Sequence, residues 1–283
     1  MHIVEIENPE KMKLNKIKMS ADDMDGMEQV KEPLHRTASF YMMVGPPQAR
    51  KTNLVFSMLL KRKRFYNQMF ENVHVFSNNI HTISEKMNLD EDRIHKGLDF
   101  AELKGVVDSI PKDERLLLVF DDLITSIQKN IKIFLRIVFN RRHIGKGCHV
   151  WLIFQKLNKI PAELRLGADG LFVFKSPNNS EIETLYHEFF NMPRDEFRQI
   201  LDHCWKKRHD FMFLKLDEVE SKKYYHCFNL LKFTSPHLDH ESRYNASWGV
   251  RVLHTQIVVW AGAVCRMLSC CFLSSSEFLG ICI

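Results

Sequence analysis

Short, uninterrupted apolar runs recur along the middle of the chain and alternate with longer amphipathic segments. Apolar runs of this length are typical of strands that are buried on both faces of a sheet. Between the runs, the pattern predicts helices over residues 53–66 and 126–141. Strands that alternate with helices favour an α/β fold, with a mostly parallel sheet covered by helices. The predicted strands are residues 39–44, 72–77, 116–120, 149–155 and 171–174.

The pattern changes after the last of these runs. Ser180 and Glu183 match a capping box that opens a helix, and Pro193 suits the first turn of another helix. Two further apolar runs, at residues 211–216 and 224–233, are joined by a short polar connection. Together they predict a C-terminal β-hairpin at the edge of the sheet.

Composition divides the chain into three regions. Residues 1–35 are rich in Met, Lys and Asp without a clear period, and they suggest a flexible N-terminal arm. Residues 36–233 hold all the predicted strands and form one domain. Residues 234–283 are apolar and rich in Cys, and their structure is poorly specified. The uncharged stretch between His254 and Arg266 is too short to span a membrane. An interfacial helix, a poorly specified extension and a reading-frame accident all remain open, so no firm membrane association is expected.

Overall composition adds limits rather than a function. With 283 residues and 45% apolar content, the chain can bury one large core. A net charge of +5 permits a nucleic-acid partner without requiring one. The first residues lack the apolar segment of a signal peptide. The cysteines of the body are scattered, which favours a reduced, intracellular protein.

The cysteines give little support to a metal site. No C-x-x-C pair occurs, which argues against a zinc ribbon. His203-Cys204 and His226-Cys227 are adjacent pairs, whose side chains would point apart on a strand or a helix. Buried thiols are therefore favoured over metal ligands at these positions.

The first predicted strand runs into V-G-P-P-Q-A-R-K-T-N, residues 44–53. Gly45, Lys51 and Thr52 match the phosphate-binding template G-x-x-x-x-G-K-[ST], whereas Arg50 replaces its second glycine. In such a loop, backbone N–H groups surround phosphate, the lysine reaches the β- and γ-phosphates, and the hydroxyl binds Mg²⁺. The expected ATP and Mg²⁺ site comprises Gly45, Pro46, Pro47, Gln48, Ala49, Arg50, Lys51, Thr52 and Asn53.

Arg50 leaves three interpretations of this loop open. The template glycine serves a backbone shape with little room for Cβ, and a bulky residue costs on the order of 1–3 kcal/mol if φ is positive. Arginine, however, binds phosphate itself through a planar fork of donors. The loop could thus be a working ATP site, a damaged site, or only a turn after a strand.

Polar residues also follow two other predicted strands. Asp121 and Asp122 end the run at residues 116–120, and Gln155 ends the run that begins at His149. Ligands of open α/β sheets bind at the carboxyl ends of the strands, where these residues would meet the loop. There Asp121 would bind Mg²⁺, Asp122 would act on the attacking water, and Gln155 would sense the γ-phosphate.

A basic group precedes the glutamine strand, in Asn140-Arg141-Arg142-His143. It suits the solvated end of a helix. It also suits an arginine finger that completes the site of a neighbouring subunit by stabilising charge in the transition state. We prefer Arg142 to Arg141 for that role, and Arg165 is a second candidate.

The ordered set G-P-P-Q-A-R-K-T, L-L-L-V-F-D-D, R-R-H-I-G-K-G-C-H-V-W-L-I-F-Q and I-P-A-E-L-R resembles the FtsK–HerA superfamily of P-loop ATPases. It is most similar to the genome-packaging ATPases of poxviruses, related large DNA viruses, virophages and Polinton-like elements. The resemblance covers residues 36–233, and the Arg-His pair ahead of a strand ending in Gln is its most telling part.

The resemblance implies a RecA-like core in a homo-oligomeric ring, a hexamer or pentamer. ATP would be hydrolysed with Mg²⁺ between subunits, while double-stranded DNA passes through the pore without sequence preference. The residue roles given above carry over, with Arg142 as the finger. Capsid or portal-type proteins would be partners, and the protein would act in the virion and the host cytoplasm, at the site of viral assembly.

Two alternatives remain open at this point. One is another DNA-pumping NTPase of the FtsK–HerA type, which would serve chromosome segregation or conjugation. The other is a catalytically impaired relative that is retained as an assembly subunit. Arg50 is the feature that favours the second alternative, because it departs from the family motif.

Overall fold

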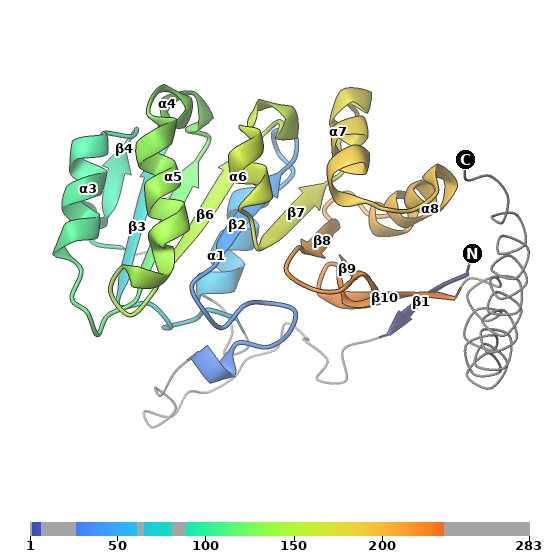
Figure 1. Cartoon of the computed structure of the whole chain (residues 1–283), viewed down its shortest axis with the longest axis horizontal. Coiled ribbons are helices and arrows are strands. Elements are labelled where there is room, and N and C mark those ends of the chain that lie inside the picture. The colour runs from blue at the N-terminus through green and yellow to red at the C-terminus, as the bar shows by residue number, and fades with distance from the viewer. Residues whose placement is uncertain (1, 7–26, 61–64, 81–88, 235–283) are drawn as a thin grey trace, which may run out of the picture. The chain divides into compact units, whose positions relative to one another are not determined.

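The computed structural model describes residues 2–6, 27–60, 65–80 and 89–234 (Figure 1). The chain divides into two units, of which the first comprises residues 3–232. The first unit contains the elements that position the site. Residues 235–283 of the predicted tail, and the basic run at residues 61–64, lie outside the described residues.

A mixed sheet forms the centre of the described part of the chain. Its strand order is β1-β10-β9-β8-β7-β2-β6-β5-β3-β4. The strands are β1 (His2–Ile6), β2 (Phe40–Val44), β3 (Asn72–Ser77), β4 (Ile94–Lys96), β5 (Leu116–Asp121), β6 (Cys148–Phe154), β7 (Gly170–Phe174), β8 (Phe211–Lys215), β9 (Tyr224–His226) and β10 (Asn229–Thr234).

Six neighbouring strands of the sheet, β7, β2, β6, β5, β3 and β4, run parallel to one another. Next to β7, the strands β8, β9 and β10 follow in antiparallel pairs. All residues of β2, β6 and β7 are buried, as their unbroken apolar sequences predict. The predicted α/β class with a mostly parallel sheet and C-terminal antiparallel strands is therefore confirmed.

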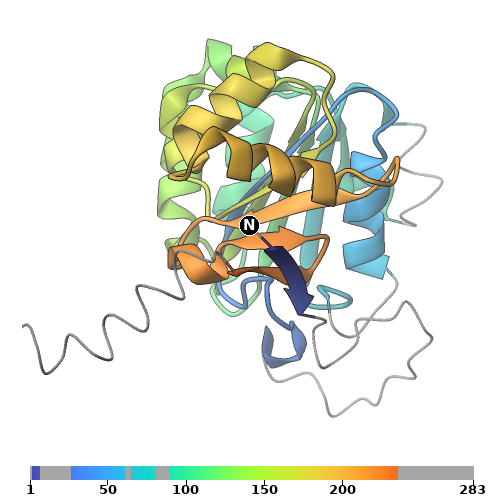
Figure 2. The same cartoon turned by 90° about the vertical axis from the view of Figure 1, so that its right-hand side faces the viewer.

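Helices cover both faces of the sheet, which appears edge-on in Figure 2. Val55, Met58 and Leu59 of α1 pack on one face, in a core that contains Tyr41 and Trp151. The opposite face carries α5, whose Phe134 contacts the Phe120 ring of β5 at 5.0 Å between centroids. The α-helices are α1 (Lys51–Leu60), α3 (Phe100–Ser109), α4 (Ile124–Lys129), α5 (Ile131–Asn140), α6 (Ala162–Leu166), α7 (Asn179–Phe189) and α8 (Arg194–Cys204).

Several helix boundaries differ from the predicted ones. The helix expected over residues 126–141 is interrupted at Asn130, which separates α4 from α5. The side chain of Asn178 caps α7 by accepting a hydrogen bond from the Ser180 N–H, so Ser180 is not the cap. Pro193 precedes the first turn of α8 instead of lying in it. In each case a polar or rigid residue, either inside the expected helix or next to its expected start, ends or starts the helix.

The predicted two-stranded hairpin is a three-stranded meander. The run at residues 224–233 turns at Cys227 and Phe228, and it forms β9 and β10 rather than one strand. Cys227 has a φ of +54°, in the left-handed region that ends strand geometry. The apolar character of this turn explains why the sequence pattern did not reveal it.

Part of the predicted N-terminal arm belongs to the core. Residues 27–34 include the short 3₁₀ turn η1 (Met27–Gln29), and the side chains of Met27, Val30 and Leu34 are buried. These residues pack in the same cluster as Tyr41. The flexible-arm prediction is therefore wrong for residues 27–34. None of the helices in the described ranges is long and apolar enough to cross a membrane.

Candidate functional site

The loop between β2 and α1 is closely packed against the neighbouring strand. A Cβ atom on Gly45 would lie 2.6 Å from the Cβ atom of Phe174, which ends β7. Any side chain at position 45 would therefore require the two strands to move apart. This close approach explains the glycine directly after β2, independently of any role in binding phosphate.

Lys51, the first residue of α1, folds back over this loop. Its Nζ donates hydrogen bonds to the carbonyl oxygens of Gly45 at 2.6 Å and Pro46 at 2.9 Å. Burial lowers the pKa of Lys51, and the carboxylates of Asp121 and Asp122 oppose that shift. The ammonium group is thus held at the mouth of the loop, where a phosphate-binding lysine is needed.

Arg50 adopts the backbone conformation that the template glycine provides. Its φ is +69°, and Gln48 has a φ of +64°. Left-handed backbone is unfavourable for residues with a Cβ, at about 1–2 kcal/mol per residue. The Arg50 side chain is exposed, so the guanidinium does not fill the interior of the loop. The loop shape is retained despite the substitution, at a conformational cost.

The carboxyl end of β5 faces the start of α1. The Thr52 hydroxyl donates a hydrogen bond to Oδ2 of Asp121, at 3.4 Å. Burial raises the pKa of Asp121, as does the charge of Asp122, whereas Lys51 and Thr52 act in the opposite direction. Mg²⁺ prefers hydroxyl and carboxylate oxygens, so this pair, as predicted from sequence, fits the ion.

Asp122 and Gln155 meet beside this pair. The Gln155 amide donates to Oδ2 of Asp122 at 2.7 Å, although the two residues follow different strands. Asp122 has a φ of +57°, and its backbone N–H donates to the carbonyl of Ile153 at 2.9 Å. The hydrogen bond fixes the Asp122 carboxylate next to Asp121. The structure therefore brings together the residues that the sequence assigned to water and the γ-phosphate.

Arg142 lies at the opposite edge of the sheet. It belongs to the 3₁₀ turn η3 (Arg141–His143), which precedes the amino end of β6. Its side chain borders a hollow of about 330 Å³. The lining of that hollow consists of Met27, Arg36, Thr37, Ala38, Arg115, Arg142, Lys146, Gly147 and His149. Because the parallel strands separate the two edges, Arg142 cannot reach the loop of its own chain.

The other two candidate finger residues have structural partners. Arg141 is buried and binds both carboxylate oxygens of Asp169, at 2.8 and 2.7 Å. The Arg165 guanidinium pairs with both oxygens of Glu188, each at 2.5 Å, and also donates to the Ile160 carbonyl. Of the adjacent pair, Arg142 is therefore the residue whose side chain is exposed for a neighbouring subunit.

A second hollow, of about 420 Å³, opens beside the phosphate-binding loop. Five of the residues that line it, three of them basic, were not among the site residues predicted from the sequence. For three of them a signal was present in the run W-K-K-R, residues 205–208, which directly follows α8 but matches no motif. The hollow is lined by Pro46, Pro47, Gln48, Ala49, Phe174, Lys175, Trp205, Lys206 and Arg208.

Sequence comparison identifies no relative of this chain. No model of a known protein family matches it, and no curated protein matches it. The fold, by contrast, has clear counterparts among solved structures.

One counterpart is the genome packaging NTPase B204 of Sulfolobus turreted icosahedral virus 2, in complex with sulfate. It has a TM-score of 0.52 and 13% identity, over 65% of this chain and 94% of B204. B204 of Sulfolobus turreted icosahedral virus, a DNA-packaging ATPase, has a TM-score of 0.48 and 10% identity, over 71% and 100%. The pCW3 conjugation coupling protein TcpA has a TM-score of 0.44 and 10% identity, over 69% and 60%. At 13% identity, the likeness to B204 is a likeness of fold, and it agrees with the α/β class that the sequence predicted.

Proposed function

We propose that this protein is an ATP-hydrolysing motor of the FtsK–HerA type, which pumps double-stranded DNA and serves viral genome packaging. The observation that carries the proposal is the meeting of three strand ends at one edge of the sheet. Thr52 contacts Asp121, and Gln155 contacts Asp122, beside the loop that holds Lys51. Such a set can bind phosphate, hold a metal ion and orient water at one place, which a simple turn after a strand would not require.

In this proposal each residue of the candidate site has a defined role. Lys51 moves from the loop carbonyls to the β- and γ-phosphates of ATP, where its charge is better compensated. Thr52 and Asp121 would hold Mg²⁺, which would supply positive charge to neutralise the phosphates. Asp122, oriented by the Gln155 amide, accepts a hydrogen bond from the attacking water and aligns it with the γ-phosphate.

Arg142 would act in the neighbouring site of a homo-oligomeric ring. Its position at the opposite edge supports a role between subunits, since the guanidinium lies far from its own phosphate loop. A hexamer or pentamer would surround the duplex and contact its phosphates without reading sequence. The viral task is supported by the likeness to B204, and it implies capsid or portal-type partners and action at the assembly site.

Two alternative functions share the same site. A segregation or conjugation motor would differ in its partners and not in its ATP chemistry. An impaired assembly subunit is favoured by the strained Arg50 in the phosphate loop. Two measurements distinguish these alternatives from a packaging motor. A segregation or conjugation motor would hydrolyse ATP but would not associate with capsid proteins. An impaired assembly subunit would associate with capsid proteins without hydrolysing ATP.

The deciding experiment is DNA-stimulated ATP hydrolysis by the full-length protein. We expect hydrolysis that rises with duplex DNA and falls at least about 100-fold in Lys51→Ala, because phosphate charge then lacks its cation. Lys104→Ala on the exposed surface of α3 is the matched control and should retain activity. If the native protein and Arg50→Gly both lack activity as assembled oligomers, the ATPase proposal is wrong and the assembly role replaces it.

A further inference from the structure

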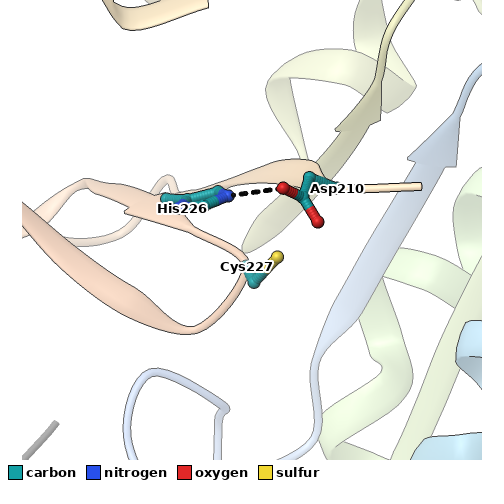
Figure 3. Close-up of side chains that lie close together, drawn as sticks. All are labelled: Asp210, His226 and Cys227. Carbon is teal, nitrogen blue, oxygen red and sulfur yellow. Dashed lines mark hydrogen bonds and ion pairs between the residues drawn. The ribbon is translucent and has the colours of Figure 1, made fainter. Parts of the chain in front are cut away.

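Asp210, His226 and Cys227 converge on one point beside the antiparallel strands (Figure 3). The carboxylate, imidazole and thiol atoms that they offer all lie within 4.8 Å of one another. His226 Nε2 lies 3.1 Å from Oδ2 of Asp210. Among the residues that the structure describes, no other group of this kind was found.

The backbone turn at Cys227 creates this cluster. His226 ends β9, and the left-handed conformation of Cys227, with φ of +54°, takes the next side chain off the strand. The Cys227 N–H donates to the Phe211 carbonyl at 2.8 Å, which holds the turn against the start of β8. Asp210 immediately precedes that strand. The expectation that His226 and Cys227 point apart is therefore wrong, because it assumed regular strand geometry through both residues.

The three groups form a ligand set suited to zinc. Thiolate, imidazole and carboxylate bind Zn²⁺ at about 2.0–2.3 Å in tetrahedral geometry, which places ligand atoms roughly 3–4 Å apart. The His226–Asp210 distance of 3.1 Å already falls in this range. The thiol disfavours Mg²⁺ and Ca²⁺, which take oxygen ligands. The side chains of His226 and Asp210 are 19% and 21% exposed, so an ion can enter.

We propose that Asp210, His226 and Cys227 form a binding site for Zn²⁺. A water molecule or His203, whose ring centroid lies 5.3 Å from that of His226, completes the coordination. An Asp–His hydrogen bond alone would not require a cysteine. Nor would a simple turn, since glycine or asparagine adopts the left-handed conformation of Cys227 at lower cost.

The position of the site gives the ion a structural task. Phe211 pairs with Phe174, so Asp210 lies at the edge of the sheet that carries the phosphate-binding loop. Arg208, near Asp210 in the sequence, lines the hollow beside that loop. Zinc would tie the turn after β9 to the segment before β8, and so hold Arg208 at the hollow. This inference concerns metal binding and does not depend on ATP hydrolysis.

Cobalt binding to the full-length protein provides the first test. Tail thiols are removed beforehand by replacing Cys265, Cys270, Cys271 and Cys282 with serine, which leaves Cys227 as the partly exposed thiol of the described region. We expect one Co²⁺ per chain, with thiolate-to-metal charge-transfer absorption and the intense visible bands of tetrahedral cobalt. Added Zn²⁺ should displace the cobalt and abolish these bands.

Variants then assign the ligands. Cys227→Ser should abolish the charge-transfer absorption, and His226→Gln should weaken Co²⁺ binding at least about 100-fold, more than the loss of an outer partner does. His143→Gln and Asp202→Asn, at exposed positions, are matched controls and should bind as the parent does. Cobalt binding without a charge-transfer band, or an unchanged band in Cys227→Ser, overturns the proposal.

Alkylation of Cys227 tests the site without any substitution in it. In the parent protein, Zn²⁺ should slow the reaction of Cys227 with iodoacetamide at least about tenfold, because the metal-bound thiolate is a poorer nucleophile. Peptide mass spectrometry identifies the modified residue. An equal rate with and without Zn²⁺ overturns the proposal even if the variants fail to fold.

Discussion

The two edges of the parallel sheet differ in how complete their polar groups are. At the carboxyl edge, Thr52 contacts Asp121 and Gln155 contacts Asp122, so side chains of the candidate site meet partners from the same chain. The hollow at the amino edge is bordered by Arg36, Arg115, Arg142 and Lys146, and no acidic side chain is among the described residues that line it. One edge resembles an assembled site. The other presents mainly basic side chains, although Arg115 pairs with Glu71 of the same chain at 3.5 Å.

The largest expected effect is on ATP hydrolysis, and it tests whether Arg142 at the amino edge acts in the site of a neighbouring subunit. Arg142→Ala should lower DNA-stimulated ATP hydrolysis about 1,000-fold or more, as the loss of an arginine finger does. Mixing it with Lys51→Ala subunits should restore activity, because some interfaces then pair an intact loop with an intact Arg142. Arg136→Ala, exposed on α5, is the control. No recovery on mixing would mean that Arg142 does not act across an interface.

The next effect concerns the carboxyl edge. Gln155→Ala should lower the single-turnover rate about 100-fold while nucleotide binding is retained, because Asp122 loses the amide that orients it. Mixing Gln155→Ala subunits with Lys51→Ala subunits should not restore ATP hydrolysis. Both residues belong to the site of their own chain, so every site in the mixture lacks one of them. Gln128→Ala serves as the control on α4. Recovery in this mixture would place Gln155 in a neighbour's site and remove the contrast between the edges.

The parallel sheet, and the grouping of the candidate site residues at its carboxyl edge, could be predicted from local sequence. Unbroken apolar runs specify buried strands, and parallel strands bring their carboxyl ends to one edge whatever the loops do. Lys51, Asp121 and Gln155 could therefore be grouped before the structure was known.

What sequence could not provide depends on contacts between distant segments. The burial of Val30 and Leu34 follows from packing with Tyr41, which no local period reveals. The turn at Cys227 lies within an apolar run, without Gly or Pro to mark it. The meeting of Asp210 with His226 follows from this turn and from the pairing of β8 with β9.

A smaller effect concerns the stability of the amino edge. Burial lowers the pKa of His149 to about 3, and the charges of His35, Arg115 and Arg141 act in the same direction. Its folded pKa lies below the unfolded value, so its contribution to stability is present at neutral pH and is lost as pH falls from about 6.5 to about 3. The loss between pH 7 and pH 5 should be about 2 kcal/mol.

Urea unfolding across this pH range measures the contribution. His149→Gln should flatten the pH dependence, because glutamine does not titrate and can still hydrogen-bond with Ser39, as His149 does. The exposed His187→Gln should leave the dependence unchanged. Equal slopes for the parent protein and His149→Gln would show that His149 is not the titrating group, and that the amino edge is no more acid-sensitive than the rest.

The smallest effect lies within the carboxyl edge. Arg50→Gly should raise the free energy of unfolding by about 0.5–1 kcal/mol, since relief of left-handed backbone outweighs the greater freedom of glycine in the unfolded chain. Arg50→Ala keeps a Cβ and should give no such gain. Chemical denaturation of the nucleotide-free protein compares them. Equal stabilities for the two variants would mean that Arg50 carries no backbone strain.

The contact between Gly45 and Phe174 also constrains how this protein can evolve. A Cβ at position 45 would lie 2.6 Å from the Cβ of Phe174. Every residue except glycine has a Cβ, so almost any residue at position 174 would clash with a side chain at position 45. A smaller side chain at position 174 does not remove that atom, and glycine there would weaken the strand. The two positions therefore form an epistatic pair with almost no neutral path.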